Sequence, residues 1–210
     1  MSHSMTERAE LAETFRETGP DAPTRCEGWR SRHLLAHLVL RERRPWAVGA
    51  DLLSRARPGQ EPRLGRLADQ AADPAGFASL VDVLADGPPA WNPMGLLGDR
   101  ANLLEMVVHH EDLRRGDLAE AEPRVLPTER VRAVWEHLQP MARLTYRSSP
   151  VGVVLVVPGG PRAAVRREAD SVAVVGDPVE LALHAFGRTE AADVEVLGRP
   201  ETVSRFLSGR

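Results

Sequence analysis

Hydrophobic residues recur at helical spacing along the first two thirds of the chain. Leu11 and Phe15 stand four residues apart behind Thr6, a possible N-cap, which predicts an amphipathic helix over 6–18. Similar periodicity predicts helices over 30–44, 75–87, 100–115 and 131–140. Asp99 is the expected N-cap of the helix over 100–115, and the helix over 131–140 is expected to end near Pro140. Residues 45–57 either continue the helix over 30–44 or form a new helix that starts at Pro45. Proline, glycine and aspartate interrupt the pattern over 57–75.

The pattern changes after residue 148. The stretch VGVVLVVPGGPRAAVRREADSVAVVGD, residues 151–177, alternates hydrophobic runs with PGG and AD turns, which predicts three strands. A helix over 177–188, a short strand over 192–198 and a final helix over 200–209 follow. We therefore expect an α+β protein, with a helical bundle over 1–147 and a small α+β domain over 148–210.

Charge and hydropathy narrow the classes of partner. The formal net charge is −3, so no basic excess is present to neutralise phosphates, and a nucleic-acid partner is not expected. We interpret the densest basic run, RERR at 41–44, as a solvated helix end whose arginines complement the helix dipole. No run approaches the roughly 20 apolar residues of a membrane span, so no membrane partner is expected either.

The chain has a single cysteine, Cys26. A lone cysteine excludes an internal disulfide framework and a cysteine-rich zinc finger, and it fits a reducing compartment. Because the N-terminal segment also lacks an apolar signal core, we expect a cytoplasmic protein. We interpret Cys26 as a buried packing residue and not as a nucleophile, since no base or metal ligand adjoins it in the sequence.

One predicted helix carries polar residues where a core stripe is expected. In and just before LLEMVVHHEDLRR, residues 103–115, four polar residues follow spacings of three, four and three, so they share one helix face: Asn102, Glu105, His109 and Asp112. Leucine, methionine and valine fill most positions around Glu105. Burying a glutamate among them is costly unless a partner is present.

A second predicted helix carries His33 and His37, one turn apart among leucines and valine. Imidazole and carboxylate groups that meet inside a helical bundle suit a divalent metal, which would offset the buried glutamate. A set of His37, Glu105 and His109 would leave coordination positions open, and Asp112 could orient the His109 imidazole by accepting its other ring N–H. The residues alone leave open a surface ion pair or a hydrogen-bonded core histidine.

Two motifs resemble one known family. PTRCEGWRSRHLLAHL, residues 23–38, and EMVVHHED, residues 105–112, are similar to the two signatures of the mycothiol-dependent maleylpyruvate isomerase family, within the DinB-like metal-binding four-helix bundles. The closing segment, residues 174–207, is similar to the small C-terminal domain often appended to these bundles. The resemblance therefore implies a DinB-like four-helix bundle followed by a small α+β domain.

Carried onto this chain, the resemblance assigns the metal ligands to His37, Glu105 and His109. Two imidazoles and a carboxylate favour zinc as the metal. Gly28 and Trp29 fall on the segment before the second helix, where we expect a turn residue and a packing residue.

Three further residues have open roles. Where the family commonly has an acidic residue, this chain has His33, which is a surface neighbour, a hydrogen-bond partner of a ligand or an alternative ligand. His110 lies on a different helix face from His109 and is expected to be solvated or capped. Arg188 resembles the arginine of a Gly-Arg pair in the family, and it either binds an anionic substrate group or caps a helix end.

The resemblance implies a low-molecular-weight thiol, mycothiol, as cofactor and an electrophilic small molecule as substrate. A bound divalent cation stabilises thiolate over thiol, which suits isomerisation or S-transfer. Two other functions remain open: a metal-binding sensor or regulator without turnover, and a small-ligand carrier whose binding site lies in residues 150–210. The sequence does not indicate an oligomeric state.

Overall fold

The computed structural model describes residues 2–54, 56–89, 91–92, 98–116 and 122–209. The chain divides into two compact units, residues 1–123 and 124–210, and each has buried hydrophobic residues of its own. Among the described helices, none is both long and apolar enough to cross a membrane.

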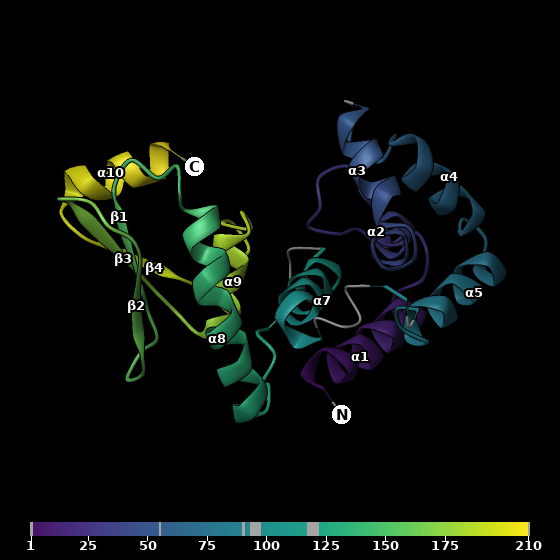
Figure 1. Ribbon diagram of the computed structural model, residues 1–210, viewed down its shortest axis with the longest axis horizontal. Helices are drawn as coiled ribbons and strands as arrows, with labels where there is room; N and C mark the ends of the chain where they lie inside the picture. Colours follow the sequence, from purple (N-terminus) through teal and green to yellow (C-terminus); the bar gives the residue numbers. More distant parts are fainter. Residues whose placement is uncertain (1, 55, 90, 93–97, 117–121, 210) are drawn as a thin grey trace. The chain divides into compact units, whose positions relative to one another are not determined.

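Four helices of the first unit form a bundle (Figure 1). They are α1 (His3–Thr18), α2 (Ser31–Arg43), α5 (Pro74–Ala85) and α7 (Asp99–Arg114). Two shorter helices, α3 (Pro45–Leu53) and α4 (Pro62–Gln70), pack against α2 and against each other. This arrangement agrees with the predicted N-terminal helical domain, and it brings the two helices with polar stripes, α2 and α7, into contact.

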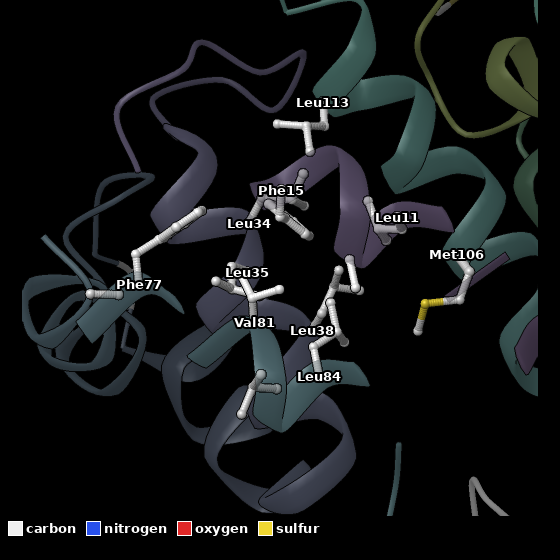
Figure 2. Packing of buried hydrophobic residues seen from close by; sticks show 13 residues of the cluster. Leu11, Phe15, Leu34, Leu35, Leu38, Phe77, Val81, Leu84, Met106 and Leu113 are labelled. Carbon is white, nitrogen blue, oxygen red and sulfur yellow. The ribbon is translucent and has the colours of Figure 1, made fainter. Parts of the chain in front are cut away.

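Leucine and phenylalanine side chains from all four bundle helices meet in the core of this unit (Figure 2). The rings of Phe15 on α1 and Phe77 on α5 pack edge to face, with centroids 6.1 Å apart. Leu11, Leu34 and Leu38 are fully buried. Each such side chain contributes about 1.5–3 kcal/mol through its removal from water, so the core fixes how α2 lies beside its neighbours.

The N-terminus of α1 is capped twice. The sequence predicted Thr6 as its N-cap, but the N-cap is Ser2. The Ser2 hydroxyl accepts a hydrogen bond from the Met5 backbone N–H at 3.3 Å. Asp99 is the first residue of α7, and its carboxylate accepts from the backbone N–H groups of His3 (3.0 Å) and Ser4 (2.8 Å). Asp99 therefore caps α1 and not its own helix.

Two proline residues mark helix starts that the sequence left open or missed. Pro45 begins a new helix, because Arg44 adopts a non-helical conformation (φ −145°, ψ 63°) between α2 and α3. Pro62 begins α4, which the proline- and glycine-rich pattern did not predict. Leu64 and Ala68, four residues apart, are buried and give α4 its apolar face.

The second unit contains a mixed four-stranded sheet and three helices. The strands are β1 (Gly152–Val156), β2 (Arg162–Arg166), β3 (Ser171–Val175) and β4 (Glu195–Leu197), in the order β2-β1-β3-β4. The central strands β1 and β3 are parallel, whereas β2 and β4 pair antiparallel at the edges. Val153 pairs with Val172 and Leu155 with Val174, and all four are buried, so one sheet face forms the core.

Helix α8 (Thr128–Thr145) packs against β2 and against α9 (Pro178–Ala185), whereas α10 (Pro200–Ser208) packs against β3. The boundary between the two compact units lies between residues 123 and 124, which is one helix before the expected boundary between 147 and 148. The predicted end near Pro140 is also wrong, since α8 continues through this proline. Leu138 and Ala142, on either side of it, are fully buried and hold the helix in place.

Candidate metal centre

The three predicted ligand residues meet between α2 and α7. His37 comes from α2, and Glu105 and His109 lie one turn apart on α7. The Nε2 atoms of both histidines lie 3.3 Å from the same carboxylate oxygen, Oε1 of Glu105. The two imidazole rings meet edge to face, with centroids 5.3 Å apart.

Hydrophobic neighbours hold these three residues in place. On α2, the fully buried Leu34 and Leu38 lie next to the His37 turn, and on α7 the fully buried Met106 follows Glu105. Because a helix places residues four apart on one face, the same packing that buries the leucines directs His37 toward α7. The position of the site thus follows from the bundle core.

Arg41 and Asn102 position Glu105. The Arg41 Nε lies 3.3 Å from Glu105 Oε1, and Arg41 Nη1 donates to Asn102 Oδ1 at 3.0 Å. The prediction that Arg41 belongs to a solvated helix end is wrong, because its side chain is only 16% exposed. Its spacing of four residues from His37 was the signal that places it on the same face.

Asp112 and Cys26 lie behind His109. Asp112 Oδ2 is 2.9 Å from His109 Nδ1, the arrangement expected from the sequence, and its carboxylate is fully buried. The Cys26 thiol donates to the same oxygen at 3.2 Å. A backbone hydrogen bond from Arg25 N to Asp112 O, 2.9 Å long, holds the Cys26 loop against α7. Cys26 packs against the core, but it is half-buried and not buried as predicted, and it also belongs to the surroundings of the site.

Gly28 and Trp29 shape the loop that enters α2. Gly28 has φ 73°, and a Cβ there would lie 2.8 Å from the Pro58 carbonyl oxygen, so the turn requires glycine. Trp29 packs against the hydrophobic core, and its ring lies 5.2 Å from the His37 ring between centroids. Both residues therefore have the turn and packing roles that the sequence predicted.

Positive charge between His109 and Glu105 satisfies both groups. An ionised Asp112 only accepts hydrogen bonds, so His109 Nδ1 carries a proton, and Nε2 faces the Glu105 carboxylate with a second N–H in the protonated ring or with a lone pair in the neutral ring. Two acceptors facing each other repel unless a proton or a metal ion lies between them. A proton on Nε2, or a metal ion in its place, therefore completes the arrangement.

The pKa shifts of Glu105, His109 and His37 arise from burial and from the contacts among these residues. Burial alone would raise the pKa of Glu105, but hydrogen bonds from His109 and His37 hold this pKa well below its ordinary value. Burial alone would lower the pKa of His109, but Asp112, Cys26 and Glu105 raise it well above its ordinary value. Burial lowers the pKa of His37, which favours its neutral, ligating form.

The donor atoms fit a zinc ion. Tetrahedral zinc with bonds of ~2.0–2.2 Å places neighbouring ligand atoms roughly 3.3–3.6 Å apart. The Glu105 oxygen lies 3.3 Å from each Nε2 atom. Within the described part of the chain, the ligand atoms of His37, Glu105 and His109 all lie within 4.8 Å of one another, as do those of two other groups: Cys26, His109 and Asp112, and Glu7, Glu10 and His110.

The remaining predicted residues lie elsewhere. His33 is the third residue of α2, where its Nδ1 accepts from the Arg30 backbone N–H at 3.2 Å, and it belongs to none of these groups of described residues. His110 is buried and not solvated as expected. In the second unit, Arg188 follows α9 and its Nη1 donates to the Phe186 carbonyl oxygen at 2.8 Å.

A comparison with known protein families agrees with these motifs. Residues 1–114 match the family described as the mycothiol maleylpyruvate isomerase N-terminal domain. Neither a curated relative nor a solved structure matches the chain. Since the match covers more than half of the sequence, the chain belongs to the mycothiol maleylpyruvate isomerase N-terminal domain family.

Proposed function

We propose that this protein is a metal-dependent enzyme that activates a low-molecular-weight thiol, with mycothiol as the thiol that the family description names. The activated thiol serves isomerisation or S-transfer on an electrophilic small molecule. His37, Glu105 and His109 are the proposed ligands, and zinc is the proposed metal. The supporting observation is the single Glu105 oxygen that lies 3.3 Å from both histidine Nε2 atoms.

The bound cation supplies one property, the stabilisation of thiolate over thiol at neutral pH. The protein residues supply the rest. Asp112 holds the His109 proton on Nδ1 and so keeps Nε2 available as a ligand. Arg41 holds the Glu105 carboxylate in position. Three protein ligands leave a coordination position for the thiol, as catalytic zinc sites require.

Two further assignments belong to the same proposal. A thiol cofactor requires a reducing compartment, and the free thiol of Cys26 is compatible with the expected cytoplasmic location. Arg188 is the proposed donor to an anionic group of the cofactor or substrate, because the fork of guanidinium N–H groups matches the geometry of a carboxylate.

Metal analysis of the purified protein tests this proposal. We expect about one zinc per chain in the wild type, and loss of zinc from His37→Ala and Glu105→Ala. His137→Ala, on α8 of the second unit, is the matched control and keeps its metal. A metal-free wild type that melts at the same temperature as both variants contradicts metal binding.

The role of the thiol needs a second measurement. Cobalt-substituted protein is titrated with mycothiol, and sulfur coordination is expected to change the visible spectrum of the cobalt site. A spectrum that mycothiol leaves unchanged would show that the site binds metal but does not bind the thiol.

A further inference from the structure

A pocket of about 420 Å³ lies between α2, α3 and α4, three helices that pack together in the first unit (Figure 1). The buried side chains of Val39, Leu40 and Ala47 give it an apolar wall. Trp46, the second residue of α3, also lines the pocket and is 64% exposed. Ligand pockets typically have volumes of about 300–1,000 Å³ and largely apolar and aromatic walls, so this pocket suits a small organic molecule.

The polar part of the wall is positively charged. Four arginines line the pocket, which we call the arginine pocket: Arg43, Arg44, Arg63 and Arg66. None of the described residues that line it is acidic, although the whole chain has a formal net charge of −3. Guanidinium groups around one cleft repel each other, and a low-dielectric wall strengthens this repulsion. A bound anion offsets it, so the pocket favours a negatively charged ligand.

Three of these arginines have no carboxylate partner in the described part of the chain. Arg63 pairs with a carboxylate of α3 at 3.2 Å. Arg43 Nη2 donates to the Val83 carbonyl oxygen at 3.2 Å, which holds this cation in the wall without neutralising it. Arg44 and Arg66 are exposed and form no ion pair with a described residue. Their N–H groups are therefore accessible to a ligand in the pocket.

The aromatic and the cationic parts of the wall are in contact. The Arg63 guanidinium lies over the Trp46 ring, 5.9 Å from its centroid. A single ligand can consequently pack a ring against the indole and the apolar wall while its anionic group accepts from the arginines. Carboxylates and phosphates both match the fork of guanidinium N–H groups.

The arginine pocket and the proposed metal centre lie on different sides of α2. His37 and Arg41, four residues apart, are directed toward Glu105 on α7. Val39 and Arg43, which line the pocket, each follow them by two residues, and two residues correspond to about 200° of rotation around a helix. The pocket is thus a separate site, and an inference about it does not depend on the proposed metal chemistry.

We propose that the arginine pocket binds a small organic anion that combines an aromatic body with a carboxylate or phosphate group. The anionic group accepts hydrogen bonds from Arg44 and Arg66, and the ring packs against Trp46. An uncharged aromatic molecule of the same shape binds more weakly, because it leaves the repulsion among the arginines in place.

Titration of the full chain with naphthoate, naphthyl phosphate and the uncharged naphthalenemethanol tests this inference. Calorimetry measures the affinities, and NMR follows the indole N–H resonance of Trp46, identified by its absence in Trp46→Phe. We expect the preferred anion to bind at least about tenfold more tightly than the alcohol and to move this resonance. The tighter of the two anions identifies the group as carboxylate or phosphate. Zinc-loaded and metal-free protein are both titrated, so that anion binding to zinc is recognised.

Charge-removing variants locate the anionic group. Arg44→Gln and Arg66→Gln are each expected to weaken binding of the anion about threefold, the effect of one exposed ion pair, and to leave the affinity for the alcohol unchanged. Arg57→Gln, which changes an exposed arginine outside the described lining of the pocket, is the matched control and leaves all affinities unchanged. An unchanged melting temperature shows that the variants are folded.

The outcomes separate this inference from the proposed function. If neither anion binds metal-free protein more tightly than the alcohol, or if both bind without moving the Trp46 resonance, the inference is wrong even when zinc is bound. Unchanged anion affinity in both arginine variants also contradicts it. If the protein binds no zinc but an anion still moves the resonance, the arginine pocket keeps its ligand class and only the proposed metal chemistry fails.

Discussion

Two adjacent histidines of α7 lie in opposite surroundings. His109 faces α2, where its Nε2 lies 3.3 Å from the carboxylate of Glu105. His110 faces α1, where its Nδ1 lies 2.8 Å from Glu7 Oε1 and its Nε2 lies 2.8 Å from the Thr14 hydroxyl. Each histidine belongs to a group of potential metal ligands, so residue type alone does not distinguish the two sites.

His109 and His110 differ in the group that faces Nε2. A hydroxyl can donate to a histidine nitrogen as well as accept from it, so the Thr14 hydroxyl can pair with His110 Nε2 in either direction. The carboxylate that faces His109 can only accept, so a proton on Nε2 or a metal ion in its place lies between the two groups. The proposed function therefore assigns the metal to the His109 group and a structural role to the His110 group.

The largest expected effect is on stability, from His110→Leu. The substitution removes one partner of Glu7, whose side chain is fully buried, and breaking a buried pair in this way costs about 3 kcal/mol. Denaturant unfolding measures this loss in the free energy of unfolding, whereas metal content is expected to stay at the wild-type level. His110→Asn, whose amide can still donate to Glu7, is the milder companion. Loss of metal from His110→Leu that still folds would contradict a purely structural role.

An intermediate effect is expected from Asp112→Asn. The amide keeps the shape of the side chain but removes the charge that orients His109, and such outer partners typically change metal affinity by about 10–100-fold. Competition with a zinc chelator measures the affinity. Asp82→Asn, which changes an exposed carboxylate on α5, is the control. An unchanged zinc affinity in Asp112→Asn would show that Asp112 does not support the ligand.

The smallest effect is expected from His33→Ala. Although His33 stands one turn before His37, its Nδ1 accepts from the Arg30 backbone and it lies outside the ligand groups of the described residues. We expect unchanged zinc affinity and a stability loss of no more than about 1 kcal/mol, the typical cost of a lost cap. A tenfold weaker affinity for zinc would restore His33 to the site.

The sequence predicted those parts of the site that depend on helical spacing. Glu105, His109 and Asp112 share one face of one helix, so their proximity follows from the geometry of a single element. The pairing of this helix with His37 was a hypothesis from the chemistry of metal sites in helical bundles, and the family resemblance then assigned the same residues. Spacing within one helix carries no information about its neighbour.

The parts that the sequence did not predict depend on tertiary contacts. Cys26 reaches Asp112 because a loop docks on α7 through the Arg25 backbone. The sequence does not distinguish Arg41 from an exposed arginine, because its partner Glu105 lies on another helix. The arginine pocket depends on α4, whose short apolar face is hidden in a segment rich in proline and glycine. Such contacts are set by how elements pack, which a local pattern does not encode.

X-ray absorption spectroscopy of the zinc-loaded full chain tests the central claim most directly. Ligation by His37, Glu105 and His109 predicts only nitrogen and oxygen neighbours at ~2.0–2.2 Å, with the multiple scattering of two imidazoles. A sulfur neighbour at ~2.3 Å would place the metal instead with Cys26, His109 and Asp112, and would contradict the proposed centre.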